Sequence, residues 1–430
     1  MRVAVIGAYG LIGSYVSARL VAEGHDVIGV GRDLTQARRR FANLHWKQAD
    51  LATASLADWT TLLDGASAVI NCAGALQDSP RDDLNAVHVE GVRRLAQACQ
   101  VLGARLIHIS AAGVETGKPT AFNTTKYAAE ALVAECAGLD WIVLRPGLVI
   151  GPAAYGGTAL LRGLAGFPGF APVVHGQSRV QVVAADDVAA AVVRCLAPGA
   201  PLRRRLDLVH AEAVTLQDLV ARLRGWLGFP AAPVIDLPPI LARITAFGAD
   251  ALAFLGWRSP MRNAALAQLR MGVRGEASDA AMLGLELKSL DALLAAMPSG
   301  VQERWFARVY FAKPLILAVL FAFWMVSGLI GVTVGFAPAV ATLTTAGVSQ
   351  DLAVAAVVGG SVADIVLTLL LAHRRTAGLA LKGMLLVTAG YLLGGALVRP
   401  DLWLDPLGPL VKSIPAAMLA VAALTTLEER

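Results

Sequence analysis

Short apolar runs alternate with helical patterns along residues 1–230. The run Val3–Ile6 shows no polar alternation and ends at glycines, a helical pattern covers Leu11–Glu23, and a second apolar run covers Asp26–Val30. Buried strand, helix and buried strand in this order are typical of a parallel βαβ unit. Further strand-like runs, each preceded by a helical stretch, lie at Ala68–Asn71, Arg105–Ser110 and Trp141–Arg145. The pattern predicts an α/β fold with a doubly wound parallel sheet.

The pattern is weaker between positions 151 and 313. Gly151–Gly176 is rich in Gly, Pro and aromatic residues, so we expect a substrate-side loop region there. A strand-like run at Leu206–Val209 follows, and then a helix with Thr215 as its N-cap. Helical periodicity recurs at Leu241–Leu255, Ala264–Met271 and Leu290–Met297. We therefore expect a domain over 1–230 and, over 231–313, a helical appendage or substrate-covering region with a juxtamembrane segment.

Four apolar segments of about 20 residues each dominate the last part of the chain, and that length suits a bilayer crossing. They cover 314–336, 352–372, 379–398 and 407–427. A buried bundle in a soluble domain is the alternative, but four consecutive segments almost free of charge argue against it. Residues 314–430 are predicted to form a four-helix transmembrane domain.

Composition and charge agree with a membrane protein. Hydrophobic residues make up 56% of the chain and charged residues only 16%, against about 25% charged in ordinary soluble domains. The turn at 373–375 is basic, whereas the 337–351 loop has no Lys or Arg and the 399–406 loop has one Arg beside two Asp. By the positive-inside rule, we expect a multi-pass protein of the bacterial inner membrane with its N-terminal domain in the cytoplasm. The N-terminus does not read as a signal peptide.

Ionisable residues also occur inside the apolar segments. Lys382 and Lys412 lie near segment ends, where a long side chain can reach the membrane surface. Asp364 lies near the centre of its segment, so it should either pair with a polar partner or mark a pathway. Gly331/Gly335 and Gly390/Gly394 have a spacing that allows close helix contact.

Two classes of function find no support in the residues. The net charge is +5, but no Lys/Arg block is interleaved with aromatic residues, so we expect no nucleic-acid partner. The four cysteines form no CxxC pair, so we expect neither a metal site nor a disulfide framework.

The first strand leads directly into Gly7-Ala-Tyr9-Gly10-Leu11-Ile12-Gly13, which opens the first helix. In that context Gly7 allows a tight turn, Gly10 lets the backbone approach a pyrophosphate, and Gly13 lets the helix pack on the strand. The helix N-terminus then offers N–H groups and a positive dipole end to the anion. The motif predicts a Rossmann-type dinucleotide site.

The end of the second strand bears on the choice of dinucleotide. An NAD site usually has a carboxylate there, but this chain has Gly31 followed by Arg32. A guanidinium can pair with a 2′-phosphate, and Gly31 leaves room for it, so NADP is favoured and NAD is the alternative. Asp33 is the competing residue for a ribose hydroxyl. Asp50 and Leu51 are expected near the adenine ring, although Asp50 could equally cap a helix.

Together these motifs resemble the short-chain dehydrogenase/reductase superfamily, in its extended and atypical branches. The resemblance covers residues 1–230 and rests on GAYGLIG (7–13), GR (31–32), DL (50–51), NCAG (71–74), HISAAG (108–113), KYAAE (126–130), LRPGLVIGP (144–152) and ADDVA (185–189). It is most similar to NmrA-like proteins and to the accessory subunit of respiratory complex I. The last segments resemble the DoxX-like four-helix membrane domain.

The resemblance implies roles for further residues. Backbone contacts to the dinucleotide are implied around Ala73, Gly74 and Pro146, and Lys126 would hold the nicotinamide ribose. Ser110 stands where the family has its catalytic Ser or Thr. In that family a Tyr hydroxyl exchanges the proton, the Lys lowers the Tyr pKa, and the Ser orients the carbonyl.

This sequence departs from the family at one position. Phe122 stands four residues before Lys126, where the family has its Tyr, and Tyr127 lies about 100° around the helix from Lys126. A substitute proton donor could be Ser110, Thr124, Tyr155 or water. Three functions follow: an NADP-dependent oxidoreductase for a lipid-soluble or membrane-associated small molecule; a non-catalytic NADP-binding sensor or assembly protein with a membrane-protein partner; and a carrier or quinone-reactive membrane module to which the reductase domain supplies electrons.

Overall fold

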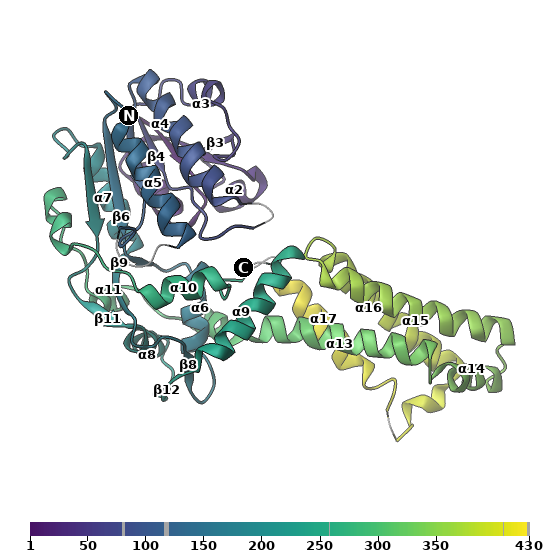
Figure 1. Ribbon diagram of the computed structural model, residues 1–430. Coiled ribbons are helices and arrows are strands. Elements are labelled where there is room, and N and C mark those ends of the chain that lie inside the picture. Colours follow the sequence, from purple (N-terminus) through teal and green to yellow (C-terminus); the bar gives the residue numbers. More distant parts are fainter. Residues whose placement is uncertain (80–81, 116–119, 258, 407, 428–430) are drawn as a thin grey trace. The chain divides into compact units, whose positions relative to one another are not determined.

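The computed structural model describes residues 1–79, 82–115, 120–257, 259–406 and 408–427. The chain divides into two compact units (Figure 1). The α/β unit comprises Met1–Asp250 and Ser259–Ala307, and the helical unit comprises Ala251–Arg258 and Arg308–Arg430.

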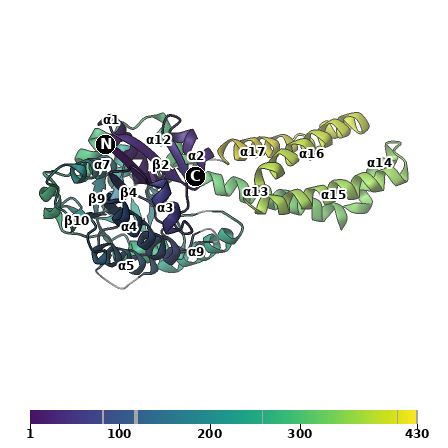
Figure 2. The same ribbon diagram turned by 90° about the horizontal axis from the view of Figure 1, so that it is seen from above.

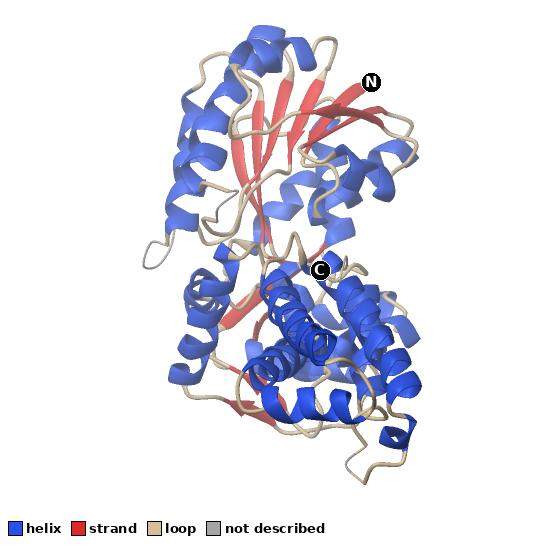
Figure 3. Cartoon of the chain, turned by 90° about the vertical axis from the view of Figure 1, so that its right-hand side faces the viewer, coloured by secondary structure: helices blue, strands red, loops and turns tan. Residues whose placement is uncertain are grey.

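A seven-stranded sheet forms the centre of the α/β unit (Figure 3). All its strand pairs are parallel, which confirms the predicted doubly wound sheet. Because β1 lies between β4 and β2, the order of the strands reverses at β1, and ligands of such sheets bind beyond the strand ends at that point. In spatial order the strands are β10 (Arg204–Leu208), β6 (Trp141–Pro146), β5 (Arg105–Ile109), β4 (Ala68–Asn71), β1 (Arg2–Ile6), β2 (Asp26–Gly31) and β3 (His45–Gln48).

Helices cover both faces of this sheet. Alternate residues of β1 point to opposite faces, so Val3 and Val5 enter one core and Ala4 and Ile6 enter the other. The first core includes residues of α1 (Leu11–Ala22) and α7 (Ala185–Leu196). The second includes residues of α3 (Leu56–Leu62), α4 (Gly91–Leu102) and α5 (Ala121–Glu135), and the short α2 (Leu34–Arg40) connects β2 to β3.

A smaller layer follows β6 along the chain. One of its sheets consists of β11 (Ala213–Thr215), β9 (Arg179–Ala184) and β7 (Leu148–Ile150), and the other of β12 (Val234–Asp236) and β8 (Ala171–Val173). Its helices are α6 (Gly156–Ala165) and α8 (Leu216–Trp226). The prediction of a loop over Gly151–Gly176 was wrong, because α6 and β8 lie within it. Leu160 and Leu161 bury the apolar side of α6, which the surrounding glycines obscured. Thr215 is confirmed as an N-cap, since its Oγ1 accepts the Asp218 N–H at 3.1 Å.

The helical periodicity beyond residue 230 is confirmed by three helices. They are α9 (Pro239–Phe254), α10 (Asn263–Met271) and α11 (Leu290–Ala296), and a 3-10 helix, η2 (Ala277–Leu283), lies between the last two. The next helix, α12 (Val301–Val309), leads from the α/β unit into the helical unit.

Among the described residues, three helices are long and apolar enough to cross a membrane: α13 (Ala312–Val332), α15 (Gln350–Ala372) and α16 (Ala377–Val398) (Figure 2). The fourth predicted segment is shorter than expected. Its helix, α17 (Ser413–Thr426), has 14 residues, or about 21 Å of helix against about 30 Å of hydrocarbon. Pro406 and Pro409 precede it, and proline disrupts a helix interior. The predicted 337–351 loop is also corrected, because α14 (Phe336–Thr345) occupies much of it.

Asp364 has polar partners inside the bundle. Its carboxylate accepts hydrogen bonds from Ser327 Oγ of α13 and from the Tyr391 hydroxyl of α16, each at 3.0 Å. Of the glycine pairs, Gly331 makes a close helix contact, since a Cβ atom there would lie 2.1 Å from Ser361 Oγ. A Cβ atom at Gly390 or Gly394 would meet open space. Lys382 and Lys412 are exposed, and it stays a prediction that their side chains reach the membrane surface.

Basic and aromatic groups gather at one end of the bundle. Arg374 donates to the Leu427 carbonyl at 2.6 Å and lies over the Trp257 ring at 5.7 Å, and Lys313 donates to the Thr426 carbonyl. Trp257 Nε1 in turn donates to the Ala372 carbonyl at 2.7 Å. The C-terminus of α17 is thereby capped by two cations, which its dipole favours.

Candidate dinucleotide and substrate site

The turn between β1 and α1 needs glycine for its geometry. Gly7 has a φ of +74°, and a Cβ atom there would lie 2.9 Å from the Ala73 nitrogen. A Cβ atom at Gly13 would lie 2.2 Å from the Gly7 carbonyl oxygen, so α1 could not pack this closely on the turn with any larger residue. Gly10 is the N-cap of α1, with extended backbone. The three glycines form the tight turn and close helix approach of a dinucleotide-binding motif.

The N-terminus of α1 is suited to a phosphate. No side chain of the described residues caps it, and the first helical residues, Leu11 and Ile12, are half-buried. The N–H groups of a first helical turn need an acceptor from outside the helix, and the helix dipole favours a negative one. The glycine cradle and this uncapped helix start fit a dinucleotide pyrophosphate.

Arg32 lies just beyond the end of β2 and is partly exposed. Its guanidinium donates to Asp82 Oδ1 at 2.7 Å and lies 3.9 Å from Asp50 Oδ2. The space expected beside Gly31 is filled by the Tyr9 ring, since a Cβ atom at Gly31 would lie 2.3 Å from a ring carbon. The predicted cation is therefore present at the strand end, but it is paired with carboxylates.

The other candidates near this strand end have local structural roles. Asp33 Oδ1 accepts the Gln36 N–H at 3.0 Å and caps α2. Asp50 Oδ1 accepts the Ala52 N–H at 3.0 Å and holds the turn after β3, while Leu51 is buried in the core. Asp50 therefore stabilises a turn and caps no helix, since the N-cap of the next helix, α3, is Ser55.

Two residues that the sequence analysis did not single out organise the ends of β4 and β5. The Ala73 N–H donates to Asn71 Oδ1 at 3.1 Å, so the Asn71 amide presents its NH2 group to His108 Nδ1, 3.1 Å away. His108 then carries its proton on Nε2, which is buried without a partner among the described residues. Burial lowers the pKa of His108 well below its usual value. A buried donor of this kind fits a ligand that brings its own acceptor.

His88 is a further residue that no pattern in the sequence indicated. It lies on η1 (Ala86–Glu90), a π-helical turn that runs into α4. Its Nε2 accepts the Ala75 N–H at 3.1 Å, so Nδ1 carries the proton and donates to Thr125 Oγ1 at 2.9 Å. Burial lowers the pKa of His88 to about 2, and the Lys126 ammonium acts in the same direction. A neutral imidazole therefore connects the loop after β4 to α5.

Lys126 is buried and points toward the same loop. Its Nζ donates to the Ile109 carbonyl at 2.9 Å, and a Cβ atom at Gly74 would lie 3.3 Å from this Nζ and 3.3 Å from His88 Nε2. Burial lowers the pKa of Lys126 to about 8, although the Glu130 carboxylate opposes that shift. Near neutral pH such an ammonium can release a proton far more readily than a surface lysine.

Ser110 is brought to the same place, because it follows Ile109 at the end of β5. Its Oγ is buried and has no partner among the described residues. Pro146, at the end of the adjacent β6, is buried, and its carbonyl accepts the Ala112 N–H at 3.0 Å. The structure thus gathers Ser110, Lys126 and Gly74 at the carboxyl ends of β4 and β5, as their order in the sequence suggested.

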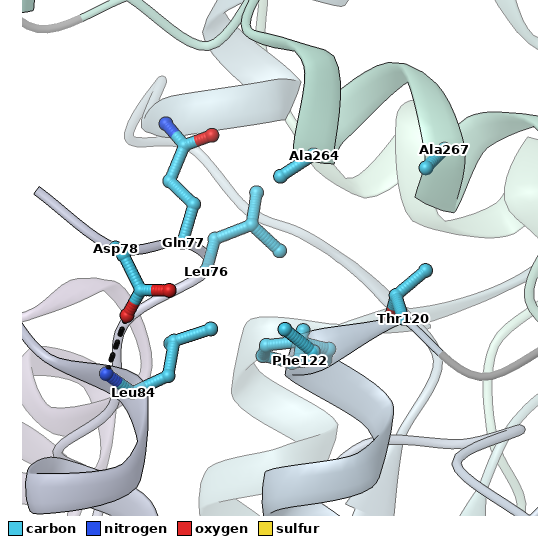
Figure 4. A pocket seen from close by; sticks show the side chains of 9 residues that line it. Leu76, Gln77, Asp78, Leu84, Thr120, Phe122, Ala264 and Ala267 are labelled. Atoms are coloured by element: carbon cyan, nitrogen blue, oxygen red, sulfur yellow. Dashed lines mark hydrogen bonds between the residues drawn. The ribbon is translucent and has the colours of Figure 1, made fainter.

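A pocket of about 330 Å³ lies beside Phe122. Figure 4 shows Phe122 and Thr120 at the start of α5 on one side and Ala264 and Ala267 of α10 on the other. Its other lining residues are Leu76, Gln77, Asp78, Leu84 and Ala121. Gln268 of α10 donates to Thr120 Oγ1 at 3.0 Å and to Asn123 Oδ1 at 2.7 Å, which fixes α10 over the pocket. The ring of Phe122 thus forms an apolar wall one helical turn before Lys126.

The hydroxyl groups considered as substitute donors are not equally placed. Tyr127 is 47% exposed, so it does not share the buried side of α5 with Lys126. Thr124 is also exposed, and Tyr155 stands at the N-cap of α6. Ser110 is the one candidate among them whose hydroxyl is buried and unpartnered within the described residues. Among all the described residues, no cluster of three or more His, Cys, Asp and Glu side chains could hold a metal ion.

Two family models match the chain in succession. Residues 3–203 match the NAD dependent epimerase/dehydratase family, and residues 321–421 match the DoxX-like family. Among solved structures, UDP-glucuronic acid 4-epimerase of Bacillus cereus, in complex with UDP-glucuronic acid and NAD, shares the fold with a TM-score of 0.53. The two chains are 17% identical, and the likeness covers 72% of this chain and 99% of that one.

Curated relatives are similar over the N-terminal part. An uncharacterized protein of Mycobacterium tuberculosis is 27% identical over 252 residues, which is 57% of this chain and 25% of that protein. The chain thus spans about a quarter of the length of that relative. The ceramide reductase of Caulobacter vibrioides is 28% identical over 244 residues, 56% of this chain and 73% of the reductase. The sequence resemblance is confirmed: this chain joins an N-terminal Rossmann domain of the NAD-dependent epimerase/dehydratase and short-chain dehydrogenase/reductase type to a C-terminal DoxX-like domain.

Proposed function

We propose that the protein is a membrane-anchored, NADP-dependent oxidoreductase that interconverts a carbonyl and an alcohol on an apolar, membrane-borne small molecule. One observation carries this proposal. Ser110 is buried at the end of β5, the buried Lys126 of α5 donates to the neighbouring Ile109 carbonyl, and Phe122, one helical turn before Lys126, lines an apolar pocket. Hydride transfer is the chemistry that the nicotinamide would supply when bound.

The chain's own residues would bind the cofactor, bind the substrate oxygen and supply the proton. The Gly7–Gly13 turn and the start of α1 would bind the pyrophosphate, and Lys126 would bind the nicotinamide ribose. The Ser110 hydroxyl, with no partner in the described part of the chain, would hydrogen-bond the substrate oxygen. Since Phe122 has no ionisable proton, the proton must come from another group. We assign its supply to Lys126, directly or through Ser110, because burial lowers the Lys126 pKa to about 8.

The lining of the pocket supports an apolar substrate. Leu76, Leu84 and Phe122 form much of its wall. The chain is similar to an enzyme named ceramide reductase, a name that indicates a lipid substrate for that enzyme. The three long apolar helices would hold the protein at a membrane. A substrate dissolved in lipid would therefore be concentrated near the enzyme.

NADP is the proposed form of the cofactor. Arg32 is a partly exposed cation just beyond the end of β2, where an NAD site would have a carboxylate, and a 2′-phosphate could take the place of Asp82 as its partner. The filled space at Gly31 means that the phosphate would approach past the Tyr9 ring.

We place the α/β unit in the cytoplasm and the helices in the bacterial inner membrane. Lys313, Arg374 and Arg375 lie at one end of the helical unit, whereas Arg399 at the other end is paired with Asp401. This asymmetry is the one expected when the first end faces the cytoplasm.

A screen for lipid-dependent turnover tests the oxidoreductase proposal. The full chain in detergent is mixed with NADPH and with fractions of a membrane extract, and absorbance follows the oxidation of NADPH. We expect one fraction to accelerate oxidation by the unaltered protein, and Ser110→Ala and Lys126→Met to abolish the acceleration. Val101→Ala, on an exposed part of α4, should leave it unchanged. Equal rates in the unaltered protein and in Ser110→Ala would count against the proposal.

Phe122 favours a second candidate, a non-catalytic NADP-binding sensor or membrane-complex assembly protein. Such a protein would bind the dinucleotide with the same glycine turn and would lack the hydroxyl that chemistry needs. The non-catalytic function is supported if no fraction accelerates NADPH oxidation by the unaltered protein while Phe122→Tyr creates turnover.

A further inference from the structure

The helix α9 buries small apolar residues and exposes large ones, which is the reverse of what a helix at a water-exposed surface does. Its buried side consists of Ala242, Ala246, Ala249 and Ala253, none more than 8% exposed. The large residues are turned outward: Ile240 is 59% exposed, Ile244 63%, Phe247 74% and Phe254 80%. Because their spacings of four, three and seven residues keep them on one side of a helix, they form one continuous apolar face.

This face is wide and carries little charge. Leu241 and Leu252, 48% and 49% exposed, extend it along its flank. The two charged residues of α9 are Arg243, which is exposed, and Asp250, which is paired with Arg262. A contiguous apolar face of this kind marks a surface that another phase or molecule covers.

The continuation of α9 indicates what covers it. The segment Ala251–Arg258 belongs to the helical unit, so Phe254 is exposed within the unit that holds the long apolar helices. Arg374 N–H donates to the Leu255 carbonyl at 2.9 Å, and Trp257 donates to Ala372. The end of α9 is thereby fixed where α15 ends and α16 begins, which is the level at which membrane helices leave the hydrocarbon.

We infer that α9 is a membrane-surface helix whose face of Ile240, Ile244, Phe247 and Phe254 inserts into the lipid leaflet. Helices of this kind lie in the plane of the interface with the apolar side in lipid and basic side chains at the headgroups, a place that Arg243 can take. Trp257 and Arg374 suit the same level, where aromatic and basic residues are common.

A position of α9 in the membrane surface would also affect the pocket at Phe122. Asp250, near the end of α9, accepts hydrogen bonds from Arg262 Nε at 2.5 Å and Asn263 Nδ2 at 2.7 Å. Asn263 begins α10, whose Ala264 and Ala267 line the pocket, and Arg262 also donates to the carbonyl of the pocket residue Asp78 at 2.9 Å. A helix seated in lipid would therefore hold the pocket's covering helix near the lipid surface, from which an apolar substrate could enter.

The test reads the surroundings of α9 directly. Phe247 in the full chain is replaced by an environment-sensitive fluorescent amino acid, and the protein is reconstituted in phosphatidylcholine nanodiscs with or without doxyl-labelled lipid. We expect doxyl lipid to quench the emission by about half, since an interfacial helix buries its apolar side about 5–10 Å into the boundary. The matched control is the same probe at Val101, 69% exposed on α4, which should not be quenched. If the probe at 247 prevents folding, position 244 carries the test.

Two results would overturn the inference. One is emission at both 247 and 244 that doxyl lipid leaves as unchanged as that at 101. The other is cross-linking of a photoreactive residue at 247 to a second copy of the chain in place of lipid. Neither readout needs bound dinucleotide or turnover, so the failure of this inference is distinct from a failure of the proposed oxidoreductase function.

Discussion

The imidazole of His88 lies edge-on against the ring of Phe122, with the two ring centroids 5.8 Å apart. The same imidazole accepts the Ala75 N–H and donates to Thr125, so it joins the loop after β4 to α5. Because Lys126 and Phe122 both lie on α5, His88 sets the distance between the loop after β4 and the wall of the pocket.

His88→Ala should therefore weaken both the fold and dinucleotide binding. Loss of the imidazole leaves the partly buried Ala75 N–H without its acceptor and removes one partner of the Thr125 hydroxyl, at a cost of about 1–3 kcal/mol in the free energy of unfolding. We expect a lower melting temperature of the full chain in detergent and a weaker affinity for NADPH by calorimetry. His45→Ala, at an exposed position of β3, is the control and should change neither. Unchanged NADPH affinity in His88→Ala would contradict the role given to His88.

Phe122→Tyr restores a hydroxyl one helical turn before Lys126. If the protein turns over, this hydroxyl should raise the rate about 10-fold or more, because a positioned general acid contributes about 10²–10⁴-fold. The measurement is the initial rate of NADPH oxidation with the active lipid fraction. Tyr127→Phe removes an exposed hydroxyl from the next position of the helix and should leave the rate unchanged. A rate equal to that of the unaltered protein would show that the proton does not pass position 122.

Lys126 should make the stability of the protein depend on alkaline pH. Its pKa is about 8 in the folded chain and near the ordinary lysine value of 10.5 in the unfolded chain, so between these values the unfolded state binds more protons and stability rises with pH. We expect the melting temperature of the unaltered protein, minus that of Lys126→Met, to rise by a few degrees from about pH 7.5 to about pH 10. A constant difference over this range would mean that Lys126 is not buried as described.

Arg32→Ala should reduce the preference for NADPH. Removal of a guanidinium from the 2′-phosphate is expected to weaken NADPH binding about 10- to 100-fold while NADH binding stays within about twofold. Calorimetric titrations of the full chain with each dinucleotide measure this. Arg19→Ala, which removes an exposed cation paired with Glu23 on α1, serves as the control. Equal or tighter binding of NADH by the unaltered protein would refute the assignment of NADP.

Tyr391→Phe should loosen the helical unit by removing one of the two hydroxyls on Asp364. Interhelical hydrogen bonds in membranes average about 0.6 kcal/mol and reach about 2 kcal/mol. A double-mutant cycle with Asp364→Asn, read as the midpoint of denaturation in mixed micelles, should show coupling of that size. Leu393→Ala, at a position of α16 that is 66% exposed, should show no coupling to Asp364→Asn.

Local patterns predicted the sheet and the dinucleotide turn because those elements depend on nearby residues. Val3–Ile6, the glycines that follow it and the Thr215 cap each determine their own structure, and the structure has all of them. The lysine of α5 could also be placed, since its position follows from the helix period and from the chain order of β4 and β5.

Other features depend on partners far away in the sequence. The loop expected over Gly151–Gly176 contains α6, which is stabilised by a core that no local pattern shows. His88 becomes important through Ala75 and Thr125, 13 and 37 residues away, and hydrophobicity alone does not mark such a residue. The length of α17 was overestimated, because hydropathy counts the apolar residues around Pro406 and Pro409 as if they were helical.

The hydrogen bonds of Asp364 restrict how the membrane part can move. A carboxylate on α15 that is held by Ser327 of α13 and Tyr391 of α16 fixes the axial register of all three helices at one depth. A slide of any one by a single turn, about 5.4 Å, would break at least one bond and expose the carboxylate to hydrocarbon. The three long helices should therefore move as one rigid piece, together with α17, whose end is held by Lys313 and Arg374, and axial motion in the membrane domain should be confined to α14.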